Sequence, residues 1–361
     1  MTAETGAHHP YHMYEAVMTQ PDACASIAVR AASVADEIVQ KLHAARRIFL
    51  VGIGTSFHAA QVGYLLFRRV GLTTQAMHAF DFALYGPPLN ADDAVILVSH
   101  RGGKVYGLQA IQRAQEAGCY TLLITGQGDP LSARYASQTF KTVEQDKSSA
   151  HTISYSTSIV ALAALANAHA RRETGAEVFA LADLPAILRS CLEREEQVKT
   201  LAQHYLNRRR IWLVGGGPSA ITAQEIALKI KETSYLQAEG MAIEVMVHGP
   251  FQCVEPEDLF ILIAPAGAAQ ERVVQFSGQV KAIGIPYLLL DDGSNAKDSA
   301  IYQGAAAVVG VPPINEELTA LTCLLPLQLF TYYLALQKGT NPDGFRLDDP
   351  RFAEGYKQLK L

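Results

Sequence analysis

The sequence has few cysteines and few charged residues. Its five cysteines are scattered over 361 residues, and no two form a C-x-x-C pair. Dispersed thiols in apolar surroundings indicate reduced, buried side chains of a cytoplasmic protein rather than a disulfide framework. Only 18% of the residues are charged, and the formal net charge is −5. Because a nucleic-acid backbone requires clustered lysines and arginines, this balance argues against DNA or RNA as the main partner.

The sequence also lacks a secretory signal, since "MTAETGAHHPYHMYEA" has no basic stretch followed by an apolar one. One apolar segment, residues 318–337, is long enough to cross a bilayer. It contains Gln328, Pro326 and three threonines and has no flanking basic cluster. We therefore expect a buried core helix there and no membrane partner.

What the sequence does contain is a duplication. "RRIFLVGIGTSFHAAQVGYLLFRR" from Arg46 is echoed by "RRIWLVGGGPSAITAQEIALKIKE" from Arg209, and "AVILVSHRGG" from Ala94 by "LFILIAPAGA" from Leu259. Two copies of one α/β unit in tandem are the simplest interpretation of this order.

Short apolar runs alternate with amphipathic stretches in each copy, which is typical of a parallel sheet covered by helices on both faces. In the first copy we predict strands near 47–53, 74–78, 94–98, 120–125 and 138–143, and helices near 56–70, 104–117 and 157–171. The expected fold class is α/β, with two tandem doubly wound parallel sheets. The predicted organisation is an N-terminal helical segment (1–35), a first domain (36–175), a linker helix (176–205), a second domain (206–340) and a tail (341–361).

Three turns of the first copy are rich in hydroxyl groups and cations, at strand ends where ligands bind in such sheets. Many donors with nearby positive charge suit a phosphomonoester dianion. The candidate phosphate ligands are Gly54, Thr55, Ser56, Ser99, His100, Arg101, Lys104, Ser154, Ser156 and Thr157.

Other interpretations of these turns remain open. A Ser or Thr at a helix start is often only an N-cap, and Arg101 and Lys104 could simply face solvent or pair with a carboxylate. "GIGTSF" resembles the start of a dinucleotide-binding G-x-G-x-x-G, with Asp81 as the ribose ligand, but Phe57 stands at the third glycine. A P-loop would need a lysine followed by Ser or Thr, which is absent.

A block of the second copy, "QEIALKIKETSYLQAEGMAIEVMVHGP" from Gln224, resembles the E-G-A-L-K-L-K-E-x-S-Y … G-E-x-x-H-G-P block of the SIS (sugar isomerase) family. The turn Ile53–Ser56 resembles its C-G-T-S, "SHRGGK" from Ser99 its S-Q-S-G-E-T, and residues 156–158 its S-T-K. Within the family the chain is most similar to the isomerase half of glucosamine-6-phosphate synthases. The resemblance implies two flavodoxin-like SIS domains and no metal or other cofactor.

By this resemblance, Glu232 is the base that moves a proton between C1 and C2 of an open-chain sugar phosphate. His248 acts in ring opening and reaches the site from the partner subunit of a homodimer. Glu225, Lys229 and Glu232 lie at positions i, i+4 and i+7, so one helix face carries all three and the lysine can tune both carboxylates. The alternatives are an ion-pair ladder on a surface helix and a histidine that only stabilises a turn before Gly-Pro.

The sequence departs from the family pattern in two places. No glutaminase domain with an N-terminal cysteine nucleophile is present, so glutamine-driven amidotransfer is not expected. Pro350 stands where the family has a tail lysine. We expect a sugar-phosphate isomerase or amino-sugar-phosphate deaminase or deglycase, and keep a non-catalytic phosphosugar sensor as the alternative. The apolar helix around residues 153–170 suggests a dimer interface.

Overall fold

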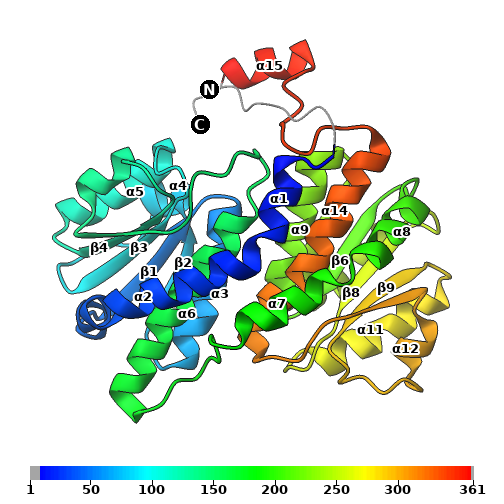
Figure 1. The fold of residues 1–361 in the computed structure, drawn as a ribbon, viewed down its shortest axis with the longest axis horizontal. Coiled ribbons are helices and arrows are strands. Elements are labelled where there is room, and N and C mark those ends of the chain that lie inside the picture. The colour runs from blue at the N-terminus through cyan, green and yellow to red at the C-terminus, as the bar shows by residue number, and fades with distance from the viewer. Residues whose placement is uncertain (1–8, 359–361) are drawn as a thin grey trace. The chain divides into compact units, whose positions relative to one another are not determined.

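The structure is a computed structural model that describes residues 9–358 (Figure 1). The chain divides into two compact units. The first-copy unit contains residues 19–146, 151–185 and 347–358, and the second-copy unit contains residues 9–18, 147–150 and 186–346. This division differs from the predicted one, since residues 9–18 group with the second copy and the tail after Arg346 with the first.

The first-copy unit is built on a five-stranded parallel sheet of order β2-β1-β3-β4-β5. Its strands are β1 (Arg47–Gly52), β2 (Thr74–His78), β3 (Asp93–Val98), β4 (Tyr120–Thr125) and β5 (Gln138–Lys141). Its helices are α2 (Gln20–His43), α3 (Thr55–Arg69), α4 (Ala79–Tyr85), α5 (Val105–Glu116), the short 3-10 helix Leu131–Tyr135, α6 (Ile153–Thr174) and α15 (Pro350–Lys357). All six residues of β3 are buried, as expected for a strand covered by helices on both faces.

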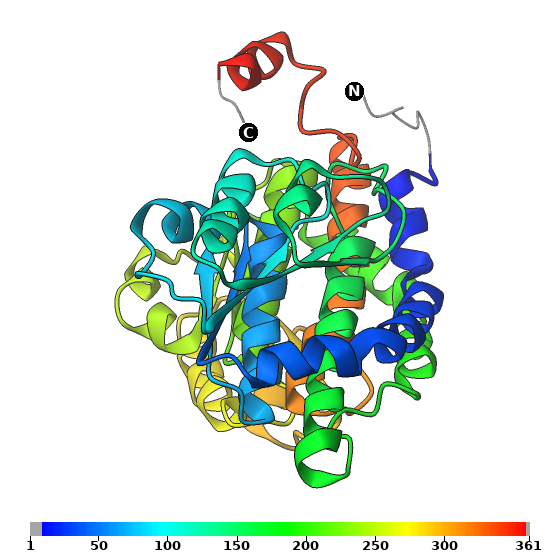
Figure 2. The same ribbon diagram turned by 90° about the vertical axis from the view of Figure 1, so that its left-hand side faces the viewer.

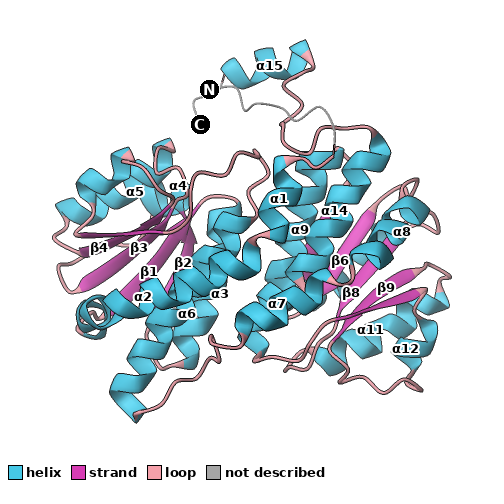
Figure 3. Ribbon diagram, in the orientation of Figure 1, coloured by secondary structure: helices cyan, strands magenta, loops and turns pink. Residues whose placement is uncertain are grey.

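The second-copy unit repeats this topology with the order β7-β6-β8-β9-β10, also all parallel. Its strands are β6 (Ile211–Gly215), β7 (Ala238–Ala242), β8 (Leu259–Ile263), β9 (Tyr287–Asp291) and β10 (Ala307–Gly310). Its helices are α1 (His12–Met18), α8 (Glu195–Tyr205), α9 (Pro218–Ser234), α10 (Ile243–Val247), α11 (Gln270–Ala282), α12 (Ala300–Gly304), α13 (Thr319–Thr322) and α14 (Leu324–Lys338), with 3-10 turns at Pro250–Cys253 and Glu316–Leu318. The predicted tandem of doubly wound sheets is confirmed (Figure 3).

The predicted linker helix is two helices. α7 (Leu184–Leu192) spans the boundary between the units, and α8 begins at Glu195 after a break in the helix. The apolar segment that ends the second copy is a core helix, as predicted. Among the described residues, one helix, Glu316–Lys338, is long and apolar enough to span a membrane, and its most apolar window is wholly buried inside the protein.

Helix α6 is covered by its own chain. Every side chain from Ser154 to Ala170 is buried, and α2 and α3 pack against it (Figures 1 and 2). Because α2 and α3 already cover it, its apolar surface is not evidence for a dimer interface. The sequence suggested one because this helix has more apolar faces than one sheet needs to cover.

Candidate functional site

The turn after β1 opens helix α3 with its backbone N–H groups at the carboxyl edge of the sheet. Gly54 has φ 55° and ψ −127°, a conformation that disfavours any residue with a Cβ. At Gly52 a Cβ would lie 2.4 Å from the backbone carbonyl carbon of Ser56, so only glycine lets the helix start this close to the strand. Thr55 and Ser56 follow in the first turn, both partly exposed. An anion beside these N–H groups is favoured by the helix dipole.

The loop after β3 lies next to this turn. β1 and β3 are paired with Val51 opposite Leu97, and the strand order reverses between them. Such a reversal is where doubly wound sheets bind ligands. Gly102, at φ 56°, bends the loop where a Cβ would meet Pro130 at 2.3 Å. The loop then carries Arg101 and Lys104 into solvent.

Arg101 and Lys104 are the cations of this edge. Within residues 9–358, neither has an ion pair or a side-chain hydrogen bond. The pKa of Lys104 is lowered, first by desolvation and second by the charge of Arg101. Two neighbouring cations without a carboxylate create a positive potential that a phosphate dianion would neutralise.

His100 differs from its two cationic neighbours because it is buried and neutral. Its Nε2 accepts a hydrogen bond from the Asp146 backbone N–H at 2.8 Å. Its carbonyl accepts from the Gly126 N–H at 2.9 Å and the Thr125 hydroxyl at 3.1 Å. Burial, and then the charge of Arg101, lower the pKa of His100 to about 4. His100 therefore positions the loop and adds no positive charge for a phosphate.

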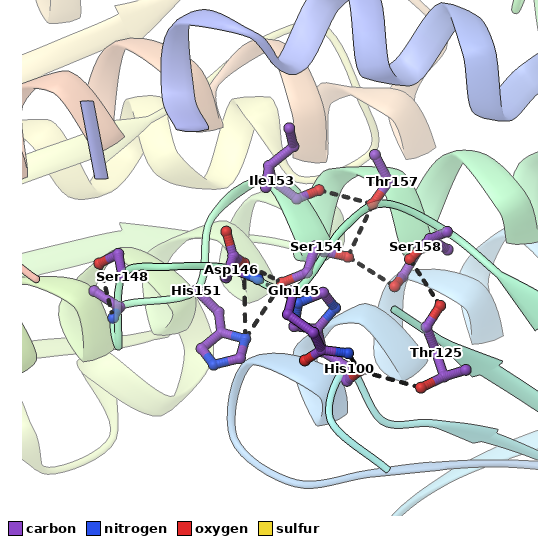
Figure 4. Close-up of polar contacts among 12 residues, drawn as sticks. His100, Thr125, Gln145, Asp146, Ser148, His151, Ile153, Ser154, Thr157 and Ser158 are labelled. Atoms are coloured by element: carbon purple, nitrogen blue, oxygen red, sulfur yellow. Dashed lines mark hydrogen bonds and ion pairs between the residues drawn. The ribbon is translucent and has the colours of Figure 1, made fainter. Parts of the chain in front are cut away.

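Three of the predicted hydroxyl ligands are turned into the protein, and Figure 4 shows two of them, Ser154 and Thr157. The Ser154 hydroxyl donates to Asp146 Oδ2 at 2.7 Å, and the Thr157 hydroxyl donates to the Ile153 carbonyl at 2.8 Å. The Ser156 hydroxyl donates to Gln20 Oε1. All three residues are buried within helix α6, which begins at Ile153 rather than near residue 157. We therefore leave them out of the phosphate site.

Asp146 and His151 are polar residues of this region that the sequence analysis did not single out. His151 Nδ1 lies 3.7 Å from Asp146 Oδ2, and its ring meets the His100 ring edge-on at 5.1 Å between centroids (Figure 4). The Asp146 side chain is 2% exposed and that of His151 22%. In the sequence, the neighbouring hydroxyl-rich segment was the more obvious candidate for a ligand site. The one signal for this pair was that residue 146 follows strand β5, at a strand end.

The second-copy unit contributes a charged cluster on helix α9. Lys229 Nζ donates to Glu232 Oε2 at 2.7 Å and lies 3.4 Å from Glu225 Oε1. The side chains of Glu225 and Lys229 are 0% and 1% exposed, and that of Glu232 is 19% exposed. The alternative of a surface ion-pair ladder is therefore wrong, and only Glu232 of the three reaches the surface.

The electrostatics of this cluster keep Lys229 charged. Burial opposes its ammonium form, but the charges of Glu225 and Glu232 and its hydrogen bonds to both outweigh that effect, so the pKa of Lys229 is raised. A permanent cation then fixes the Glu232 carboxylate in position at the surface. Such a carboxylate is suited to remove a proton from a carbon next to a carbonyl group.

His248 lies apart from that cluster, on the surface of the same unit. Its side chain is 74% exposed, and Nε2 lies 3.2 Å from Glu244 Oε2. Glu244 also accepts a hydrogen bond of 2.6 Å from Arg272 Nε, which lowers the pKa of the carboxyl. The structure thus brings Glu225, Lys229 and Glu232 together and leaves His248 outside their group.

Comparisons with known proteins agree with this architecture. The chain is 29% identical over 348 residues to the glutamine–fructose-6-phosphate aminotransferase [isomerizing] of Pyrococcus horikoshii, covering 94% of this chain and 57% of that protein. The chain thus spans little more than half the length of this curated relative.

Two solved structures share the fold. The C-terminal domain of glucosamine-fructose-6-phosphate aminotransferase from Francisella tularensis has a TM-score of 0.81 at 19% identity, covering 95% of this chain and 100% of that one. Tagatose-6-phosphate ketose/aldose isomerase from Escherichia coli has a TM-score of 0.79 at 19% identity, covering 95% and 97%. The SIS domain family model matches residues 41–168 and 204–338, one stretch in each repeated unit. The chain therefore belongs to the SIS domain family.

Proposed function

We propose that this protein is an isomerase-type enzyme for a hexose or amino-sugar 6-phosphate, with Glu232 as the catalytic base. The observation that carries the proposal is the α9 cluster, in which a buried lysine holds one partly exposed carboxylate at 2.7 Å. A fold-level likeness to an isomerase and the match of the SIS family model to residues 41–168 and 204–338 support the same class of reaction.

The proposed phosphate site is the carboxyl edge of the first-copy sheet. The α3 N-terminus with Thr55 and Ser56 would donate hydrogen bonds to phosphate oxygens, and Arg101 and Lys104 would balance the charge. Ser99 begins the same loop. The buried His100 side chain fixes the position of that loop by accepting a hydrogen bond from the Asp146 backbone N–H.

The proposed reaction moves one proton between two carbon atoms and one between two oxygen atoms of the sugar. The Glu232 carboxylate removes the proton from the carbon next to the carbonyl of the open-chain sugar phosphate and forms an enediol, and the resulting carboxylic acid returns the proton to the neighbouring carbon. A second group must transfer a proton between the two sugar oxygens and open the ring. We propose the surface His248 of a partner subunit for this step, in a cytoplasmic homodimer.

The test combines turnover with binding. Hexose and hexosamine 6-phosphates are incubated with the protein, and ketose formation and ammonia release are measured. Glu232→Gln should lower turnover by about 10²- to 10⁴-fold, with the thermal stabilisation by the sugar phosphate nearly unchanged. Glu239→Gln, on the neighbouring strand β7, is the matched control.

The alternative is a phosphosugar sensor without catalysis. It is favoured by Pro350, which occupies the place of the family's tail lysine and here begins helix α15. Tight binding of a sugar phosphate with no turnover of any member of the panel would establish the sensor and discard the enzyme. Ammonia release would instead identify a deaminase.

A further inference from the structure

A second group of polar side chains lies at the opposite edge of the first-copy sheet. His43 is the last residue of α2, four residues before β1 begins, and His169 and Glu173 lie near the end of α6. The two helices pack side by side (Figures 1 and 2). At positions i and i+4, His169 and Glu173 share one face of α6.

The three side chains are spaced as metal ligands. One ligand atom from each lies within 4.8 Å of the other two. His43 Nδ1 and Glu173 Oε1 are 3.5 Å apart, close to the separation of roughly 3.4 Å between ligands of a tetrahedral zinc ion. The side chains of His43 and Glu173 are 42% and 43% exposed, so both have room to adjust.

His169 is already oriented as a ligand. It is 4% exposed, and its Nδ1 is buried without a hydrogen-bond partner. Because Nδ1 makes no hydrogen bond, its lone pair is available to a metal when the ring proton lies on Nε2. Metal-bound histidines commonly carry their proton on the second ring nitrogen in the same manner.

The charges around the group also suit a cation. Desolvation is the main cause that lowers the pKa of His169, and the nearby His43 and Arg172 act in the same direction while Glu173 opposes them. Two helix C-termini, each with partial negative charge, end at this point. The neighbouring Arg171 pairs with Glu177, and Arg172 Nε lies 3.9 Å from Glu173 Oε1, where it competes with a metal ion for the carboxylate.

The other histidine–carboxylate group of the described chain, His100–Asp146–His151, lacks this arrangement. There His100 Nε2 accepts from a backbone N–H, so its Nδ1 carries the proton and cannot bind a metal (Figure 4). The hydrogen bonds thus distinguish two groups that are alike in composition and spacing.

We propose that His43, His169 and Glu173 bind one divalent transition-metal ion, zinc by preference, and so join the ends of helices α2 and α6. Two imidazoles and a carboxylate are ligands that Zn²⁺ accepts readily, with a fourth position left for water. The site is independent of the proposed phosphosugar chemistry. The family resemblance implied no metal, and these three residues come together only in the folded unit.

The full-length protein, stripped with a chelator, is titrated with Zn²⁺ alone by calorimetry, and Co²⁺ is added separately to follow the visible absorption of a tetrahedral site. The wild type should bind one equivalent of Zn²⁺. His43→Ala and Glu173→Gln should each bind Zn²⁺ at least about 100-fold more weakly than the wild type. Both substitutions are at half-exposed positions, so the fold should persist. Zn²⁺ should also raise the unfolding temperature of the wild type more than that of either variant.

His151→Ala and His204→Ala are the matched controls, since they remove a histidine elsewhere and should keep the full equivalent. Equal zinc stoichiometry in the wild type, His43→Ala and Glu173→Gln would overturn the proposal. Loss of the equivalent only in His151→Ala would overturn it as well, because the ion would then lie at the other group.

Discussion

The two repeated units share a backbone but differ in chemistry. The glycines that open α3 and α9 have nearly the same conformation, φ 55° and ψ −127° at Gly54 and φ 55° and ψ −126° at Gly217. The two sheets have the same strand order. The duplication has therefore kept the strand–turn–helix geometry intact.

The helices that follow these turns carry different residues at matching positions. Glu225 and Lys229 on α9 correspond to Val62 and Leu66 on α3 when the two glycines are aligned. All four are buried, with exposures of 0% for Glu225, Val62 and Leu66 and 1% for Lys229. Since an apolar pair fills this position in the first copy, the fold does not require a buried ion pair. We infer that the charges are kept in the second copy for function.

In the loops after the third strand of each unit, it is the first copy that carries the charged residues. Arg101 and Lys104 of the first copy correspond to Ala266 and Ala269 of the second. Cations are thus placed on one unit and a buried carboxylate cluster on the other.

The largest expected effect comes from breaking the buried ion pair of the second copy. Lys229→Leu leaves Glu225 buried without its cation and should lower the free energy of unfolding by about 3–5 kcal/mol in urea titrations. The double substitution Glu225→Val/Lys229→Leu grafts the first-copy residues and should be neutral or stabilising, because no charge stays buried. A double variant as unstable as the single one would contradict the comparison.

Acid should destabilise the first copy through His100. The pKa of His100 is about 4 in the folded protein, against an ordinary value of 6.5, so the unfolded chain binds the proton more readily. Its contribution is fully present above pH 6.5, falls as the pH decreases and is lost below pH 4, about 3 kcal/mol in all. His100→Asn can still accept the Asp146 N–H bond and should show a shallower loss of stability between pH 6.5 and 4. Parallel pH profiles for the wild type and the variant would refute this account.

Removing the cations of the first-copy loop should weaken anion binding. Arg101→Gln and Lys104→Gln should each raise the Kd for a sugar phosphate about 10- to 100-fold, since each removes a charge-assisted hydrogen bond. Calorimetry at low and high salt measures this, and the wild type should show the steeper salt dependence. Arg272→Gln, on the second copy, is the control and should leave the Kd unchanged. An unchanged Kd in both loop variants would show that this loop does not bind the phosphate.

The smallest effect tests whether the two turns are equivalent. Gly54→Ala and Gly217→Ala should each lower the free energy of unfolding by about 1–3 kcal/mol. The two losses should be similar, because both backbones occupy the same strained region of φ and ψ. Gly278→Ala lies within helix α11 with no heavy atom near a Cβ, and should stabilise by up to about 1 kcal/mol. Thermal unfolding compares the three. A large difference between the first two would show that the turns are not interchangeable.

Much of the fold was predictable because strands and turns leave local signals. The predicted strand at 94–98 is β3, Asp93–Val98, and the strand at 74–78 matches β2. Helix α6 was predicted four residues too late, since a run of hydroxyl residues is typical of a loop. The Ser156 and Ser154 hydroxyls of this run can be buried because Gln20 and Asp146 accept hydrogen bonds from them.

The sequence by itself determined the duplicated parallel sheets and the helix face of Glu225, Lys229 and Glu232, because periodicity and spacing are local properties of the chain. The tertiary structure alone decided which polar groups face inward. It buried His100 as a neutral support, turned Ser156 away from the strand ends and joined His43 to His169 and Glu173. The physical reason is that hydrogen-bond partners and burial come from distant segments, and these set the charge and direction of a side chain.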